Sequence, residues 1–387
     1  MNNTSHYKTP AGESAVMALY DKALAQWPVP YTTLEVETRH GRAFTIASGE
    51  PGAPALILLH GAGSNSIIWG ADVVKYSRQH RVYAVDLPGE AGRSAPNRPD
   101  WKGPAFAEWL QDVLDGLGVQ QATLAGISQG GWTALKFATS YPERVSKLAL
   151  LCPGGVTPDR LSFVFTVMRL SLMGRRGEDQ LMRTLYGSQP ITPEALEITH
   201  LMLTQFKGRM GVLPIFSDAQ LRRLLVPVLL LLGGQDPLRP SPRIAARLQA
   251  LLPHVTTVIL PKAGHVLLNT TSHILPFLAA TELHVARDVG RYGEFVGLGS
   301  SGRPDAVDTL MQMLASNDDL PTLKLADFAI GLVNTPEGGE RLRHYLLNGS
   351  QRQRNYATLY FKRRGNSLAL TEAVAKGAID REQAFAE

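Results

Sequence analysis

Residues 122–130 read ATLAGISQG, a short apolar run that leads into a serine standing between two glycines. The residues that follow, 129–140, have the character of a helix. A serine at a sharp turn from a strand into a helix is held in a strained backbone conformation, with its hydroxyl exposed above the helix N-terminus. The pattern therefore predicts that Ser128 is a nucleophile. The alternative, a glycine-rich turn in which the serine only caps the helix, is disfavoured by the strand before it.

A serine hydroxyl is a weak nucleophile at neutral pH and needs a base, which in turn needs an acid to orient it. The sequence supplies both in loops that directly follow strand-like runs. Asp236 follows residues 228–232 in the sequence GGQDP, and His265 follows residues 255–260 in PKAGH. Parallel sheets place their functional groups at the carboxyl ends of the strands. We expect His265 to be the general base and Asp236 the acid.

Other residues compete for these roles. Asp159 also follows a strand-like run, but it lies too far beyond the end of that run. Among the ten histidines, His254 precedes a strand and His273 falls within a predicted helix. Because neither histidine occupies a loop at the carboxyl end of a strand, both are expected at the surface.

Attack on a carbonyl also needs two N–H donors for the oxyanion that forms. One donor is expected to be the backbone N–H of Gln129, the residue after the nucleophile. The other is expected from the loop at residues 60–63, which reads HGAG, and the N–H of Ala62 is the candidate. We expect His60 to brace this loop.

The sequence contains no HExxH motif, no paired CxxC and no carboxylate cluster with ligand spacing. Its glycines at positions 61 and 63 complete neither a dinucleotide-binding nor a nucleotide-binding motif. We therefore expect neither a metal ion nor a cofactor.

Short apolar runs recur along the chain and alternate with amphipathic stretches such as residues 106–117. Residues 31–37 and 43–47 read as two short strands, and the apolar runs that read as strands are residues 55–59, 82–85, 122–125, 148–151, 228–232 and 255–260. This alternation indicates a mostly parallel sheet with helices on both faces. We predict an α/β fold whose core comprises residues 31–153 and 223–284, after a helical lead-in at residues 1–30.

Two regions interrupt the alternation. Residues 154–222 contain no convincing strand and are rich in Leu, Met and Phe. We predict that they form a helical cap inserted between two core strands, with a pair of ordinary surface helices as the alternative. Residues 285–387 also lack strands, and their helix signals predict a separate all-helical region. These signals are the apolar spacing from Val307 to Leu314, the Thr335-Pro336 start and the Asp380–Gln383 capping pair.

Composition narrows the class of protein further. Hydrophobic residues make up 44% of the 387 residues, which is enough for a buried core. No apolar run is long enough to span a membrane, and the N-terminal residues lack the pattern of a secretory signal. The single cysteine, Cys152, allows no internal disulfide. We expect a cytoplasmic protein, and the net charge of +5 is too mild to indicate nucleic-acid binding.

These motifs resemble the α/β-hydrolase superfamily over about residues 30–285. The resemblance implies the α/β-hydrolase fold and maps the triad and oxyanion positions onto Ser128, Asp236, His265, Ala62 and Gln129. The N-terminal part more narrowly resembles small microbial carboxylesterases. That likeness is carried by WPVPY at residues 27–31, YAVDLPGE at 83–90 and WLQDVLD at 109–115.

A serine at this position disfavours dehalogenation and epoxide hydrolysis, for which relatives of this fold use an aspartate. It favours attack on a carbonyl, and the leading hypothesis is a carboxylic ester hydrolase that works through an acyl-enzyme. The apolar residues of the predicted cap indicate a small ester with an apolar group. A carbon–carbon bond hydrolase or a cofactor-free perhydrolase would use the same triad. The remaining alternative is a ligand receptor on the hydrolase scaffold.

Residues 341–364 contain seven Arg or Lys residues, no Asp or Glu, and interleaved aromatic residues. Such a stretch can bind nucleic acid. The spacing of Tyr356, Leu359 and Tyr360 instead favours a packed helix face with solvated arginines around it. We predict that the C-terminal helices pack against the hydrolase or form a homodimer, and we do not expect nucleic acid to bind.

Overall fold

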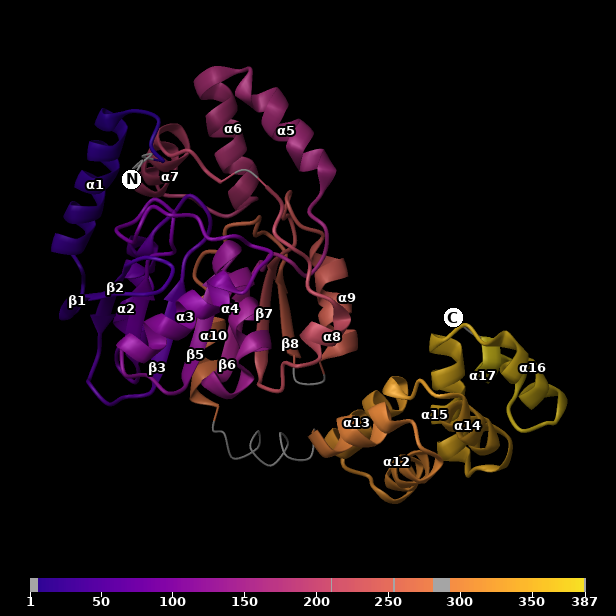
Figure 1. Ribbon diagram of the computed structural model, residues 1–387. Coiled ribbons are helices and arrows are strands. Elements are labelled where there is room, and N and C mark those ends of the chain that lie inside the picture. The colour runs from indigo at the N-terminus through magenta and orange to yellow at the C-terminus, as the bar shows by residue number, and fades with distance from the viewer. Residues whose placement is uncertain (1–5, 210, 253–254, 281–292, 386–387) are drawn as a thin grey trace. The chain divides into compact units, whose positions relative to one another are not determined.

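The computed structural model describes residues 6–209, 211–252, 255–280 and 293–385 (Figure 1). The chain divides into two compact units, Met1–Ala280 and Thr281–Glu387. Among the described helices, none combines the length and the apolar character that a membrane span requires.

An eight-stranded sheet forms the centre of the N-terminal unit, with the order β1-β2-β4-β3-β5-β6-β7-β8. The strands are β1 (Tyr31–Val36), β2 (Ala43–Ser48), β3 (Ala55–Leu59), β4 (Arg81–Val85), β5 (Ala122–Ile127), β6 (Val145–Leu151), β7 (Val228–Gly233) and β8 (Val255–Leu260). β2 pairs antiparallel with both β1 and β4, and all the other neighbours are parallel. All eight predicted strands are present, and the predicted mostly parallel α/β class is confirmed.

Helices cover both faces of this sheet (Figure 1). One buried cluster joins the sheet to α3 (Ala105–Gly116), α4 (Gln129–Ser140), α8 (Asp218–Leu221) and α9 (Ser241–Leu251). A second cluster joins it to α1 (Pro10–Ala25), the 3-10 helix η1 (Ser66–Trp69), α2 (Gly70–Tyr76) and α10 (Thr271–Ala279). Alternate residues of β3 enter the two clusters, Ile57 the first and Leu58 the second. This alternation explains why the strand is apolar throughout.

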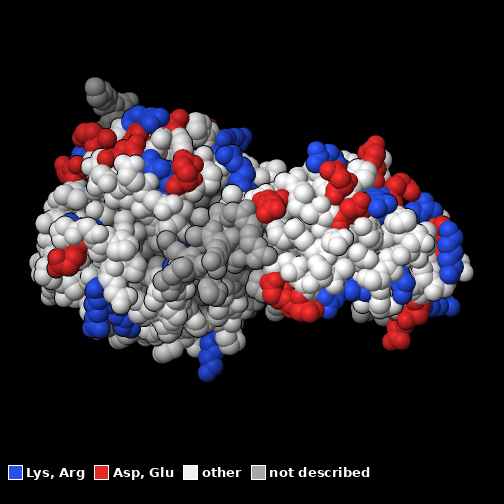
Figure 2. Space-filling model, turned by 90° about the horizontal axis from the view of Figure 1, so that it is seen from below, with Lys and Arg blue, Asp and Glu red and all other residues white. Residues whose placement is uncertain are grey.

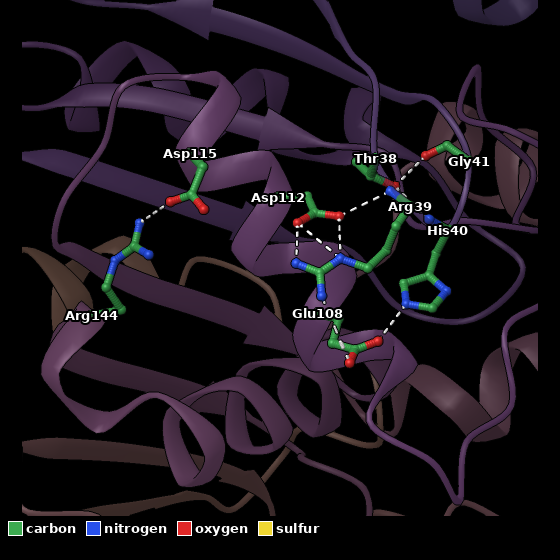
Figure 3. A network of polar contacts seen from close by, with 8 residues as sticks. All are labelled: Thr38, Arg39, His40, Gly41, Glu108, Asp112, Asp115 and Arg144. Atoms are coloured by element: carbon green, nitrogen blue, oxygen red, sulfur yellow. Dashed lines mark hydrogen bonds and ion pairs between the residues drawn. The ribbon is translucent and has the colours of Figure 1, made fainter.

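A polar network holds the outer face of α3 (Figure 3). Arg39, in the turn between β1 and β2, donates to both carboxylate oxygens of Asp112, and its Nη2 lies 2.7 Å from Oδ1. His40 Nε2 lies 2.7 Å from Glu108 Oε2. Nearer the C-terminal end of α3, Arg144 of the 3-10 helix η2 (Pro142–Arg144) contacts Asp115 at 2.8 Å. The helix is thus fixed by apolar packing on one face and by ion pairs on the other.

Helices also form most of the segment between β6 and β7. They are α5 (Leu161–Ser171), α6 (Gly174–Tyr186), α7 (Pro193–Gln205) and α8. Phe206, next to α7, packs edge-on against Tyr7, near the start of α1. Several apolar side chains of α5 and the turn after it are exposed, among them Phe165, Met168 and Leu172. The role of residues 154–222 as a cap stays a prediction.

In the described residues of the C-terminal unit, all regular secondary structure is helical. After a helical stretch at residues 293–301, the unit contains α12 (Pro304–Ser316), α13 (Leu320–Leu332), α14 (Pro336–Asn348), α15 (Gln351–Arg363), α16 (Ser367–Ala375) and α17 (Arg381–Phe385). The predicted start of α14 is confirmed, since Thr335 Oγ1 accepts a hydrogen bond from the Gly338 N–H at 3.0 Å. Asp380 likewise accepts from the Gln383 N–H at 2.6 Å.

The predicted packing face of α15 is wrong in one residue. Leu359 is exposed, because the buried arc of the helix runs through Ala357, Thr358, Tyr360 and Phe361. The arginines of residues 341–364 do lie at the surface as expected, since Arg341, Arg343, Arg352 and Arg363 have side chains that are 35–50% exposed. Four arginines form ion pairs with carboxylates elsewhere in the unit: Arg341 with Asp308, Arg343 with Glu372, Arg352 with Asp318 and Arg363 with Asp327. Figure 2 accordingly shows acidic and basic side chains intermixed on this unit, at the right of the view. Homodimer formation through these helices stays a prediction.

The two faces of α3 should differ in their contribution to stability. We expect Leu110→Ala, which empties a fully buried site, to lower the free energy of unfolding by about 2–5 kcal/mol. Arg39→Ala should cost less than about 1 kcal/mol, because the Arg39 side chain is half exposed. Denaturant unfolding followed by tryptophan fluorescence measures both, since all five tryptophans precede residue 133. An equal loss in the two variants would contradict this assignment.

Candidate active site

The turn from β5 into α4 places Ser128 in a left-handed backbone conformation, with φ 54° and ψ −106°. The flanking glycines make this turn possible. A Cβ at Gly130 would lie 2.3 Å from the carbonyl oxygen of Leu59, and a Cβ at Gly126 would lie 2.5 Å from the backbone of Gly130. Both distances are shorter than atoms tolerate, so the close approach of β3, β5 and α4 requires glycine at both positions.

The three residues predicted from strand ends lie together. Ser128 Oγ is 3.0 Å from His265 Nε2, and His265 Nδ1 is 2.8 Å from Asp236 Oδ2. All three side chains are largely buried. They come from the loops after β5, β7 and β8, which end at the same edge of the sheet.

Asp236 is held as an ionised acceptor. Its Oδ1 accepts from the backbone N–H groups of Leu238 and Arg239 at 2.8 and 2.9 Å. Burial disfavours its charge, but the hydrogen bond and the charge of His265, with these two backbone donors, lower the pKa of Asp236 below its ordinary value. An ionised Asp236 keeps the His265 proton on Nδ1. Nε2 is then left to accept the Ser128 hydroxyl proton.

The loop after β3 contributes the second predicted feature of the site. Within the described residues, neither the Ala62 N–H nor the Gln129 N–H donates to a backbone or side-chain acceptor. His60 braces this loop as expected: its Nε2 accepts from the Leu87 N–H at 2.9 Å, which leaves Nδ1 to donate to the Gly61 carbonyl at 2.8 Å. Burial lowers the pKa of His60, so its ring stays neutral.

Glu90 is a buried acid that the sequence reasoning did not identify. Its Oε2 accepts from the Gly63 N–H at 2.7 Å, and its Oε1 accepts from Gln129 Nε2 at 3.0 Å. Burial raises the pKa of Glu90. The carboxylate therefore ties the loop after β3 to the first residue of α4. Glu90 ends the stretch YAVDLPGE, but no sequence spacing predicts that it contacts Gly63 or Gln129.

Arg239 is the second residue that was missed. Its Nη1 donates to Ser128 Oγ at 3.2 Å and to the carbonyl oxygen of Cys152. Its Nε donates to Asp159 Oδ1 at 3.1 Å. Asp159, the rival candidate for the acid, is thus the partner of Arg239, while Asp236 is the carboxylate that contacts His265. The only available signal was the nearness of Arg239 to Asp236 in sequence.

In the part of the chain that the structure describes, one group of His, Cys and carboxylate side chains has the spacing of metal ligands. It consists of Cys152, Asp236 and His265, whose ligand atoms lie within 4.8 Å of one another. A metal would require the thiolate, but burial and the nearby Asp236 raise the pKa of the Cys152 thiol. These donors therefore do not suit a metal ion. Of the other histidines considered, His273 lies in α10 and is half-buried, and His254 lies outside the described residues.

Comparisons with known proteins agree with this architecture. Residues 56–280 match the model of the alpha/beta hydrolase family. The chain is 32% identical to carboxylesterase YbfK of Bacillus subtilis over 258 residues, which are 64% of this chain and 86% of that protein. It is 30% identical to the uncharacterized carboxylesterase nap of the same species over 262 residues, covering 64% and 85%.

A solved structure supports the same assignment. The crystal structure of carboxylesterase CesB (YbfK) from Bacillus subtilis superposes with a TM-score of 0.62 at 29% identity. It covers 70% of this chain and 99% of its own. The resemblance predicted from the elbow and the strand ends is confirmed, and the chain belongs to the alpha/beta hydrolase family.

Proposed function

We propose that this chain hydrolyses carboxylic esters through an acyl-enzyme formed on Ser128. The observation that carries the proposal is the continuous hydrogen-bonded series from Ser128 Oγ through His265 to Asp236, at the end of a strained strand-to-helix turn. Relatives that are named carboxylesterases support the same class of reaction. A carbon–carbon bond hydrolase or a perhydrolase remains the alternative, because both use the same three groups.

In the acylation step, Ser128 Oγ attacks the ester carbonyl carbon while His265 Nε2 takes its proton. The imidazolium that forms is stabilised by Asp236. The carbonyl oxygen becomes an oxyanion, for which the N–H groups of Ala62 and Gln129 are the proposed donors. His265 then gives its proton to the departing alkoxide, and the acyl group stays on Ser128.

In the second step, water attacks the acyl carbon and His265 takes one of its protons. The new tetrahedral intermediate uses the same two N–H donors. It collapses by breaking the bond between carbon and Ser128 Oγ, and His265 returns the proton to that oxygen. The carboxylic acid leaves and the free serine is restored.

Three further parts of the proposal rest on the sequence. They are an apolar group on the substrate, a cytoplasmic location, and the role of residues 154–222 as a cap. The proposed catalytic groups all lie in the N-terminal unit, so the C-terminal helices would carry none of them.

We expect Ser128→Ala to fold normally and to lose nearly all esterase activity. The change removes the nucleophilic oxygen and little packing volume. Hydrolysis of a small panel of p-nitrophenyl esters and labelling by a fluorophosphonate probe measure the effect, and a diketone substrate tests carbon–carbon cleavage. Activity within tenfold of wild type would refute the nucleophile. A folded wild-type protein that neither labels nor turns over would favour a receptor.

The rate should fall on the acid side of the pH profile, because a histidine base must be neutral to accept the proton of Ser128. Asp236 does not limit the rate there, because its pKa lies below the ordinary value of 3.8. The measurement is kcat/KM against pH for a neutral ester. Maximal turnover at about pH 4 would exclude a histidine base.

Glu90→Leu should impair catalysis although the side chain is of similar size. Both partners of Glu90 are donors, and leucine offers no acceptor, so both N–H groups lose their partner. Leaving a buried donor unsatisfied costs about 1–3 kcal/mol, and we expect kcat/KM to fall by about tenfold or more. Asp72→Asn is the control, since Asp72 on α2 has a pKa raised by burial to about 6. Equal rates in the two variants would argue against a role for Glu90.

A further inference from the structure

A buried cation lies against the proposed nucleophile. In the described residues, Arg239 is the only arginine with a buried side chain, at 3% exposure. Removing a guanidinium from water is unfavourable unless its donors find partners. The hydrogen-bond partners of Arg239 therefore indicate what the buried charge does.

The guanidinium reaches three acceptors. On one side, Nε donates to the carboxylate of Asp159 at 3.1 Å. On the other, Nη1 donates to Ser128 Oγ at 3.2 Å and to the Cys152 carbonyl oxygen. The charge is thus balanced by a carboxylate on its outer side, while its inner side faces the oxygen that would carry out the reaction.

The surrounding backbone fixes the position of this side chain. The Arg239 N–H donates to Asp236 Oδ1, so the same loop positions both the acid and the cation. Cys152 adopts a left-handed conformation, with φ 43°, at the residue whose carbonyl accepts from Arg239. A Cβ at Gly154 would lie 3.1 Å from Arg239 Nη2. A non-glycine residue in this conformation costs free energy, which is consistent with a function for the arrangement.

The direction of the hydrogen bonds follows from the groups involved. A serine hydroxyl has one proton and two lone pairs. With His265 Nδ1–H bound to Asp236, the Ser128 proton goes to His265 Nε2. Arg239 has only donors, so its Nη1–H must point to a lone pair of Oγ. A charged donor in this position stabilises negative charge on Oγ.

We propose that Arg239 is a further catalytic residue, which stabilises the negative charge that develops on Ser128 Oγ. This inference rests on the proposed function. Oγ takes up negative charge as the leaving group when the acyl-enzyme is hydrolysed: the bond between the acyl carbon and Oγ breaks, its electron pair moves to Oγ, and His265 supplies the proton. Arg239 keeps its own protons throughout. Asp159 is a positioning residue that anchors the guanidinium.

The test separates acylation from deacylation. Stopped-flow hydrolysis of p-nitrophenyl butyrate gives the burst of p-nitrophenol and the following steady rate. We expect Arg239→Met to slow deacylation by about 100-fold, more than it slows acylation, so that a burst appears and the acyl-enzyme accumulates in intact-mass spectra. Arg247→Met is the matched control, because Arg247 also binds a carboxylate, that of Asp218, and backbone carbonyls, but does not contact Ser128. It should leave both steps unchanged.

Further measurements exclude other roles. Guanidinium ion added at millimolar concentration should restore part of the deacylation rate of Arg239→Ala and have no effect on Arg247→Ala. A second substrate whose acyl chain ends in a carboxylate tests anion recognition. If Arg239→Met raised KM for that ester alone and left deacylation of the butyrate normal, Arg239 would be a substrate-binding residue and the proposal would be overturned.

If Arg239→Met did not fold, Asp159→Ala would carry the test, since it leaves the arginine but removes the acceptor of its Nε–H; slower deacylation is expected, and an unchanged rate would overturn the proposal. If Ser128→Ala kept its activity, the proposed function would fail whatever Arg239 does. If Ser128 formed the acyl-enzyme and Arg239→Met released it at the normal rate, only this inference would fail.

Discussion

The site depends on the left-handed backbone of Ser128. That conformation turns the chain from β5 into α4 within one residue, and it is possible only because Gly126 and Gly130 let the helix approach β3 and β5. The turn is held from the neighbouring strand by the hydrogen bond from the Ser128 N–H to the Leu151 carbonyl, at 2.8 Å. The sheet therefore supplies the rigidity that a strained residue needs in order to persist.

The main features of the fold and of the triad could be predicted because they depend on local patterns. Continuous apolar runs mark the strands that are buried on both faces, such as β3 and β7, and all eight strands were located. Asp236 and His265 follow directly from their places after β7 and β8. The ends of adjacent parallel strands meet at one edge, so a position in sequence becomes a position in space.

Glu90 and Arg239 could not be predicted in the same way. Glu90 contacts Gly63 and Gln129, which are remote from it in sequence, and Arg239 contacts Ser128 across more than one hundred residues. No periodicity or motif relates such residues, because their contacts depend on how three loops fold over the sheet edge. The exposed Leu359 shows a similar limit, since helical spacing defines a face but the neighbouring helices determine which face is buried.

Polar residues in the stretches that carry the resemblance contribute mainly to structure. Asp112 and Asp115, in residues 109–115, hold α3 to the β1–β2 turn and to Arg144 (Figure 3). Glu90, at the end of residues 83–90, holds the loop after β3. A likeness in these stretches therefore indicates a shared scaffold more directly than a shared substrate.

The buried charges around Ser128 have different relations to the reaction. Asp236 is ionised and favours a positive charge on His265, which forms when the serine proton is transferred. Glu90 holds the loop after β3 through the Gly63 N–H, and burial raises its pKa. Arg239 supplies positive charge directly at Oγ. Asp236 and Arg239 thus both favour the charge distribution of a serine that has given up its proton, and one loop supplies the two groups.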